Sequence, residues 1–103
     1  MITETKNYLV RCDQATAELL MGELKKITGD DPKQNEIKGI GGDAELILYG
    51  TAAFGALKAF FELIKTIIET GRTIKGIKVG ERELNNPKVS DITELQRQVG
   101  DSK

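Results

Sequence analysis

The stretch Ala44–Thr70, AELILYGTAAFGALKAFFELIKTIIET, decides the fold. Its first part ends in the continuous apolar run Leu46–Tyr49, which predicts a central strand covered on both faces. After Gly50 the pattern predicts a helix over Ala52–Thr70, because its charged residues recur at steps of four, three and four. A buried strand that leads into a long helix favours a domain in which helices cover a sheet.

The Ala52–Thr70 helix has more apolar surface than one buried stripe requires. Neighbouring helices, a partner or second copy, or a membrane surface must cover the remainder. The charged stripe is not strongly basic, which argues against a membrane surface. We hypothesise that Phe54, Phe61 and Ile68 contribute to a partner-binding surface, because residues seven apart lie near one helix face.

The N-terminal part predicts a strand, a helix and a loop. Asn7–Cys12 alternates as a half-buried strand does, with Tyr8, Val10 and Cys12 on one side and Asn7, Leu9 and Arg11 on the other. Asp13 stands at an N-cap position, and apolar residues at helical spacing predict a helix over Gln14–Thr28 that Gly29 ends. The polar segment Asp30–Asp43 is interpreted as a long loop made flexible by the glycines at 39–42.

The C-terminal part predicts a hairpin and a third helix. Thr73–Val79 and Glu81–Leu84 read as short strands around Gly80, which suits a tight turn. Asp91 is a candidate cap for a helix that Gly100 ends. The order β-α-β-α-β-β-α predicts a single α+β domain over residues 1–103, a two-layer sandwich in which helices cover a sheet of about four strands. We expect disordered ends at about 1–5 and 101–103.

Composition argues against several classes of function. The 103 residues suit one domain, and 15 basic against 16 acidic residues leave a net charge of -1, which disfavours a dedicated nucleic-acid binder. The chain has no histidine, which excludes a histidine general base or metal ligand. The lone Cys12 cannot form an intramolecular disulfide and reads as a small core residue. We therefore expect no enzyme activity, no cofactor and no metal.

Two local patterns are candidates for binding a ligand, an anion in one case and RNA in the other. Gly50 to Gly55 forms the first half of a phosphate-binding loop, but Ala56 and Leu57 stand where lysine and serine or threonine belong, which excludes nucleotide hydrolysis. A weaker alternative stays open, a small-ligand sensor that binds an anion at the helix start near Gly50. The segment from Lys65 to Lys88 has six basic and three acidic residues but no aromatic one, which argues against base stacking on RNA.

The N-terminal segment and the most apolar stretch indicate where in the cell the protein is expected. Met1 to Lys6 lacks the basic and apolar regions of a secretory signal, so we expect a cytoplasmic protein. The apolar stretch Ala52 to Ile68 is interrupted by Lys58, Glu62 and Lys65, so we expect no membrane span.

The chain resembles the effector-associated constant component domains, small α+β modules of bacterial conflict and defence systems. The resemblance is carried by the order of elements, by the start of the long helix at 50–57 (GTAAFGAL), by the lysine-rich hairpin at 74–84 (IKGIKVGEREL) and by the closing segment 91–95 (DITEL). It implies a non-catalytic adaptor whose partner is a protease-like or ATPase-like effector. Self-association, a phage-type inhibitor that blocks another protein, and the small-ligand sensor stay open as alternatives.

Overall fold

The computed structural model describes residues 5–38 and 44–101. The elements in chain order are β1 (Thr5–Cys12), α1 (Gln14–Thr28), β2 (Lys33–Lys38), β3 (Ala44–Ala53), the 3-10 turn η1 (Phe54–Ala56), α2 (Leu57–Glu69), β4 (Ile74–Val79), β5 (Arg82–Asn85) and α3 (Val89–Asp101). The strands form one sheet in the order β2-β3-β1-β4-β5, with every neighbouring pair antiparallel. The first four strands with α1 and α2 make a split β-α-β arrangement, which β5 and α3 extend.

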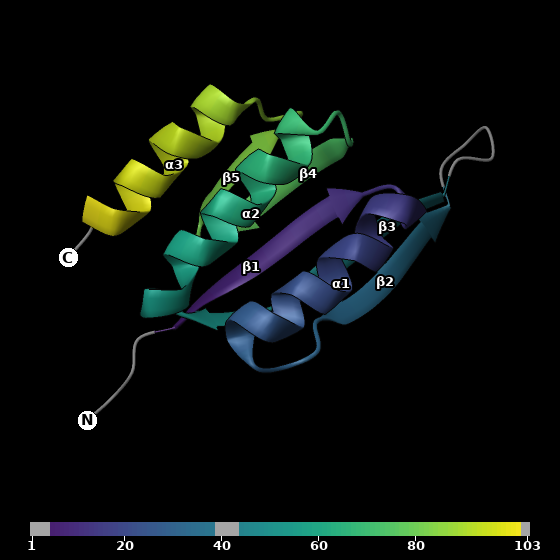
Figure 1. The fold of residues 1–103 in the computed structure, drawn as a ribbon, viewed down its shortest axis with the longest axis horizontal. Helices are drawn as coiled ribbons and strands as arrows, with labels where there is room; N and C mark the ends of the chain where they lie inside the picture. Colours follow the sequence, from purple (N-terminus) through teal and green to yellow (C-terminus); the bar gives the residue numbers. More distant parts are fainter. Residues whose placement is uncertain (1–4, 39–43, 102–103) are drawn as a thin grey trace.

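All three helices lie on the same face of the sheet (Figure 1). Side chains that point to this face, such as Val10, Leu48 and Ile77, are buried in one core with the helices. The predicted α+β, two-layer sandwich is confirmed. Within the described ranges 5–38 and 44–101, no element covers the opposite face of the sheet.

The sheet has five strands instead of about four, because part of the expected loop Asp30–Asp43 is the edge strand β2. β2 pairs with β3 from Lys33 opposite Tyr49 to Lys38 opposite Ala44. Lys33–Glu36 are exposed, so the strand has no alternation of apolar and polar residues that the sequence could reveal. Backbone pairing with its neighbour makes it a strand. The glycines at 39–42 lie outside the described residues.

The boundary between β3 and α2 also differs from the prediction. β3 continues to Ala53, because Gly50–Ala53 pair with Tyr8–Thr5 of β1. The helical part then begins with η1, and α2 begins at Leu57, five residues after the predicted start. β3 lies between β2 and β1, and the described elements cover one of its faces and not the other, so the prediction of cover on both faces is wrong.

The wide apolar surface of α2 is covered within the chain. α2 lies between α1 and α3 on the sheet (Figure 1), and Phe60, Phe61 and Ile64 are fully buried. The Phe60 ring centroid lies 5.3 Å from that of Tyr8 on β1 and 5.5 Å from that of Phe61. Of the three ways to cover this helix that the sequence left open, cover by neighbouring helices is present, and together with the sheet these helices bury Phe60, Phe61 and Ile64.

The predicted turns and caps are mostly confirmed. The Asp13 carboxylate accepts a hydrogen bond from the backbone N–H of Thr16 at 2.8 Å, and Gly29 ends α1 with a φ of 84°. Gly80 has a φ of 62° in the tight β4–β5 turn. Asp91, however, lies inside the first turn of α3, where its carboxylate accepts a hydrogen bond from the backbone N–H of Lys88.

The expected disordered ends lie almost entirely outside the described residues. Thr5 is the first residue of β1 and Asp101 is the last residue of α3. α3 therefore continues through Gly100, where the sequence predicted its end.

Candidate functional site

The three residues predicted to bind a partner do not form one exposed surface. Phe61 is only 1% exposed and belongs to the core, so its predicted role as an exposed contact is wrong. Phe54 and Ile68 are half-buried against the same core. Phe54 and Phe61 line a shallow hollow between α2 and α3, whereas Ile68 lies near the other end of α2. Packing of α3 against α2 removes most of the surface that the seven-residue spacing suggested.

The helix start near Gly50, on which the alternative of an anion-binding sensor depends, is not where the sequence predicts it. Gly50 lies within β3, opposite Tyr8 of β1, and its backbone is extended. The α-helix begins seven residues later at Leu57, and its N-cap residue Ala56 makes no side-chain cap hydrogen bond. The glycine serves strand packing instead, because a Cβ at position 50 would lie 2.9 Å from the hydroxyl oxygen of Tyr8.

Cys12 is a core residue, as the strand pattern predicts. Its side chain is fully buried on the helix-covered face of β1. Burial, with smaller contributions from the charges of Asp13 and Glu45, raises the pKa of the thiol to about 12. The thiol is therefore protonated at neutral pH and is not a nucleophile.

The described residues contain neither a cluster of metal ligands nor a membrane-spanning helix. Residues 5–38 and 44–101 contain no group of three or more cysteine, aspartate or glutamate side chains placed to hold a metal ion. Over the same residues, no helix is both long enough and apolar enough to cross a bilayer.

The uncovered side of the sheet, which we call the open face, is the candidate site. Strand pairing and the alternation of side chains place the members of each strand on it. The described side chains of the open face are Lys33 and Asn35 of β2, Glu45, Ile47, Tyr49, Thr51 and Ala53 of β3, Thr5, Asn7, Leu9 and Arg11 of β1, Lys78 of β4, and Glu83 and Asn85 of β5.

The centre of the open face is apolar. Leu9, Ile47 and Tyr49 lie on the two central strands, and each side chain is only half-buried. Leu9 and Tyr49 are directly opposite each other in the β1–β3 pair. A solvent-facing side of an antiparallel sheet usually carries polar residues, so apolar groups at its centre set this face apart from an ordinary solvated one.

Arg11 is held flat across the open face. Its guanidinium donates a hydrogen bond to the Asn85 side-chain oxygen at 2.6 Å and lies 3.8 Å from the Glu45 carboxylate. The side chain passes over Gly76, where a Cβ would collide with the guanidinium group. The charge of Arg11 is thus matched by a carboxylate within the sheet.

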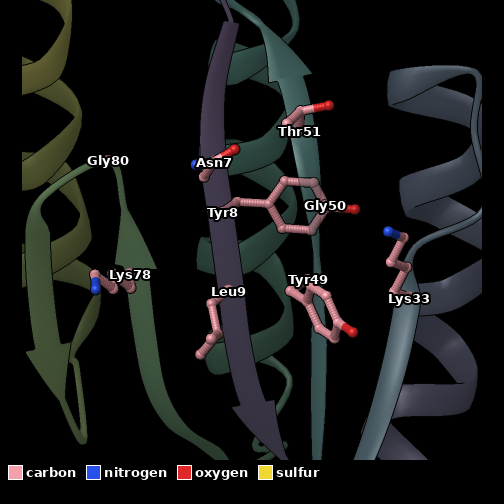
Figure 2. Close-up of a pocket in the computed structure, with 9 residues that line it drawn as sticks. All are labelled: Asn7, Tyr8, Leu9, Lys33, Tyr49, Gly50, Thr51, Lys78 and Gly80. Carbon is pink, nitrogen blue, oxygen red and sulfur yellow. The ribbon is translucent and has the colours of Figure 1, made fainter.

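Next to this apolar centre is a hollow of about 470 Å³. Its lining comes from β2, β3, β1 and β4 and from Gly80 in the β4–β5 turn (Figure 2). One row of paired residues crosses its floor in the order Lys33, Tyr49, Leu9 and Lys78. Asn7 and Thr51 lie at one end of the hollow, beside the row.

The two lysines of this row, Lys33 and Lys78, are exposed. Within the part of the chain that the structure describes, neither ammonium group has a hydrogen-bond or ion-pair partner. Three strand spacings separate them, which is roughly 14 Å at about 4.8 Å per strand. Among the described residues, the open face therefore presents two cations without an ion pair on either side of a tyrosine and a leucine, with Glu83 opposite Lys78 on β5.

The patterns in the sequence do not predict this row. The alternation of β1 did place Leu9 and Arg11 opposite the core residues, but the run Leu46–Tyr49 was interpreted as buried on both faces. β2, which contributes Lys33, was interpreted as a loop. Comparisons of the chain with protein-family models, with curated proteins and with solved structures found no match.

Proposed function

We propose that this protein is a non-catalytic, cytoplasmic interaction module that binds a protein partner through the open face. The observation that supports this proposal is the half-buried apolar centre, Leu9, Ile47 and Tyr49, on a sheet face that no described element covers. Burying such a centre is the usual source of binding free energy in protein interfaces, and the lysines beside it supply specificity. The absence of histidine and the buried, protonated thiol of Cys12 agree with a function in binding.

The resemblance to effector-associated constant component domains makes an adaptor the preferred role. In this role, the open face recruits a protease-like or ATPase-like effector of a bacterial conflict or defence system. A phage-type inhibitor would use the same kind of surface. The two differ in what happens to the captured protein, because an inhibitor abolishes the activity of its target at a fixed ratio and an adaptor does not.

The test is capture of the partner by the tagged protein from its native host, with matched variants. The open-face variant is Leu9→Thr with Tyr49→Thr, because threonine keeps the β propensity of both positions while it removes apolar surface. The control is Leu19→Gln, which removes the exposed apolar side chain of α1, 41% exposed on the helix side. Circular dichroism and thermal unfolding establish that all three proteins are folded.

We expect the wild type and Leu19→Gln to retain the same protein in a fixed ratio, and the open-face variant to lose it. Retention by all three baits would show that the partner binds elsewhere. If the wild-type bait returned alone, the interaction proposal would fail.

A further inference from the structure

We propose that the occupant of the open face is an extended segment of the partner with the pattern acidic-x-apolar-x-acidic. This inference rests on the proposed function and specifies its partner. The segment lies across the strands, with its two carboxylates at Lys33 and Lys78 and its central apolar side chain over Leu9 and Tyr49.

Strand geometry fixes the spacing of the pattern. The lysine positions are roughly 14 Å apart, and an extended chain advances about 3.3 Å per residue, so about four residues cover the distance. In an extended chain the residues i, i+2 and i+4 point to the same side. Acidic residues four apart can therefore both face the sheet, together with the residue midway between them.

The residue midway between the acids meets the apolar part of the row. Tyr49 and Leu9 are paired neighbours between the two lysines, and both are half-buried. An apolar side chain in the hollow would cover them, and the hollow is large enough, about 470 Å³, to hold it with part of its backbone. Asn7 and Thr51 at the end of the hollow are exposed and can exchange hydrogen bonds with the segment's backbone.

The distribution of charge favours separate carboxylates over a continuous polyanion. Arg11 is matched by Glu45, which leaves Lys33 and Lys78 as the available cations of the row. Glu83 lies directly opposite Lys78 on β5, so the face carries acidic groups as well as basic ones. A phosphate chain would carry a charge at every unit along its length, whereas a segment with two spaced acidic side chains places only the one at Lys78 near Glu83.

The test is fluorescence anisotropy with labelled synthetic peptides and the full-length protein. The probe is TTETFTETT, whose glutamates are four apart with phenylalanine between them. The first control is TTETFETTT, in which the glutamates are three apart and face opposite sides of an extended chain. The second is TTKTFTKTT, which reverses both charges, and labelled oligouridine represents single-stranded nucleic acid.

We expect the probe to bind in preference to all three controls. Reversal of both lysines, Lys33→Glu with Lys78→Glu, should weaken probe binding roughly tenfold or more, because each exposed ion pair contributes a few-fold and reversal adds repulsion. The same variant should gain binding of TTKTFTKTT. Lys58→Glu on the exposed side of α2 is the matched control and should leave binding unchanged.

Equal binding of the two glutamate peptides, absence of the charge-swap rescue, or tighter binding of oligouridine would each overturn the inference. The partner-capture experiment separates the two proposals. If Leu9→Thr with Tyr49→Thr still abolishes capture of the partner, the open face is the docking surface and only the proposed acidic pattern fails. If capture is insensitive to these residues, the proposed function fails as well.

Discussion

At the scale of single residues, Gly50 shows how close packing explains a small residue that looked functional. Its neighbour across the sheet, Tyr8, turns its ring over position 50 and contacts Phe60 on the other side. A Cβ at this position would lie 2.9 Å from the Tyr8 hydroxyl oxygen and 3.2 Å from two ring carbons. Tyr8 is 3% exposed and its pKa is raised, mainly by burial and also by the charge of Asp30. The ring has little room to move.

We therefore expect Gly50→Ala to destabilise the protein by about 1–3 kcal/mol, the usual cost of overpacking a core. Gly22→Ala is the control, because Gly22 is exposed in α1 and a Cβ there meets nothing within 4 Å. It should stabilise the protein by up to about 1 kcal/mol through helix propensity. Urea unfolding measures both changes. A Gly50→Ala protein as stable as the wild type would show that Tyr8 can leave this position.

At the scale of elements, α1 depends on its first turn. The Asp13 carboxylate accepts the hydrogen bond from the Thr16 backbone N–H, and the hydrogen bonds with Thr16 hold the pKa of Asp13 below its ordinary value. A lowered carboxylate pKa means that the charged form is favoured in the folded protein. Its contribution to stability is complete above the unfolded pKa of about 3.9 and is lost as the pH falls through the folded pKa.

We expect Asp13→Ala to reduce the free energy of unfolding by about 1 kcal/mol at pH 7, the typical value of an N-cap. Asp13→Asn should retain most of the cap at any pH, because an amide oxygen also accepts the hydrogen bond. Thermal unfolding from pH 7 down to pH 2 compares the three proteins. The difference in stability between the wild type and Asp13→Ala should become smaller as the pH falls. A constant difference would mean that the carboxylate charge contributes nothing.

The elements that the sequence predicted well are those with local signals. The bounds of α1 follow from Asp13, from the helical spacing of its apolar residues and from Gly29, all within the segment itself. The β4–β5 hairpin likewise follows from Gly80. β2 could not be predicted, because its residues are exposed and only pairing with β3 makes them a strand. The start of α2 was misplaced for a related reason, since Gly50–Ala53 are small residues whose conformation is set by β1.

The candidate site needed the same non-local information. Local alternation placed Leu9 on the side of β1 away from the core, which is correct. It could not show that all three helices lie on one face, and therefore that Ile47 and Tyr49 face away from them. Lys33 and Lys78 are 45 positions apart in the chain, and only the pairing of β2 with β3, β3 with β1 and β1 with β4 places them in one row across the sheet.

At the scale of the whole molecule, one-sided packing makes the two faces of β3 differ in their energetic importance. Leu48 is fully buried against the helices, and its neighbour Ile47 is half-buried on the open face. Removal of a fully buried leucine side chain leaves a cavity and costs about 2–5 kcal/mol, whereas truncation of a solvent-facing side chain costs below about 1 kcal/mol. Truncation to alanine at these two adjacent positions therefore shows, from the loss in the free energy of unfolding, whether each face is covered.

We expect Leu48→Ala to reduce the free energy of unfolding by about 2–5 kcal/mol and Ile47→Ala to reduce it by less than about 1 kcal/mol, both measured by urea unfolding at low protein concentration. Repeating both unfolding measurements at a much higher protein concentration tests self-association. A second copy bound to the open face would stabilise the wild type by mass action but would not stabilise the Ile47→Ala protein. A cost for Ile47→Ala that grows with concentration would make another copy of this chain the occupant of the open face. A cost that stays small leaves that face available to a different protein, since its apolar centre then contributes to binding and not to folding.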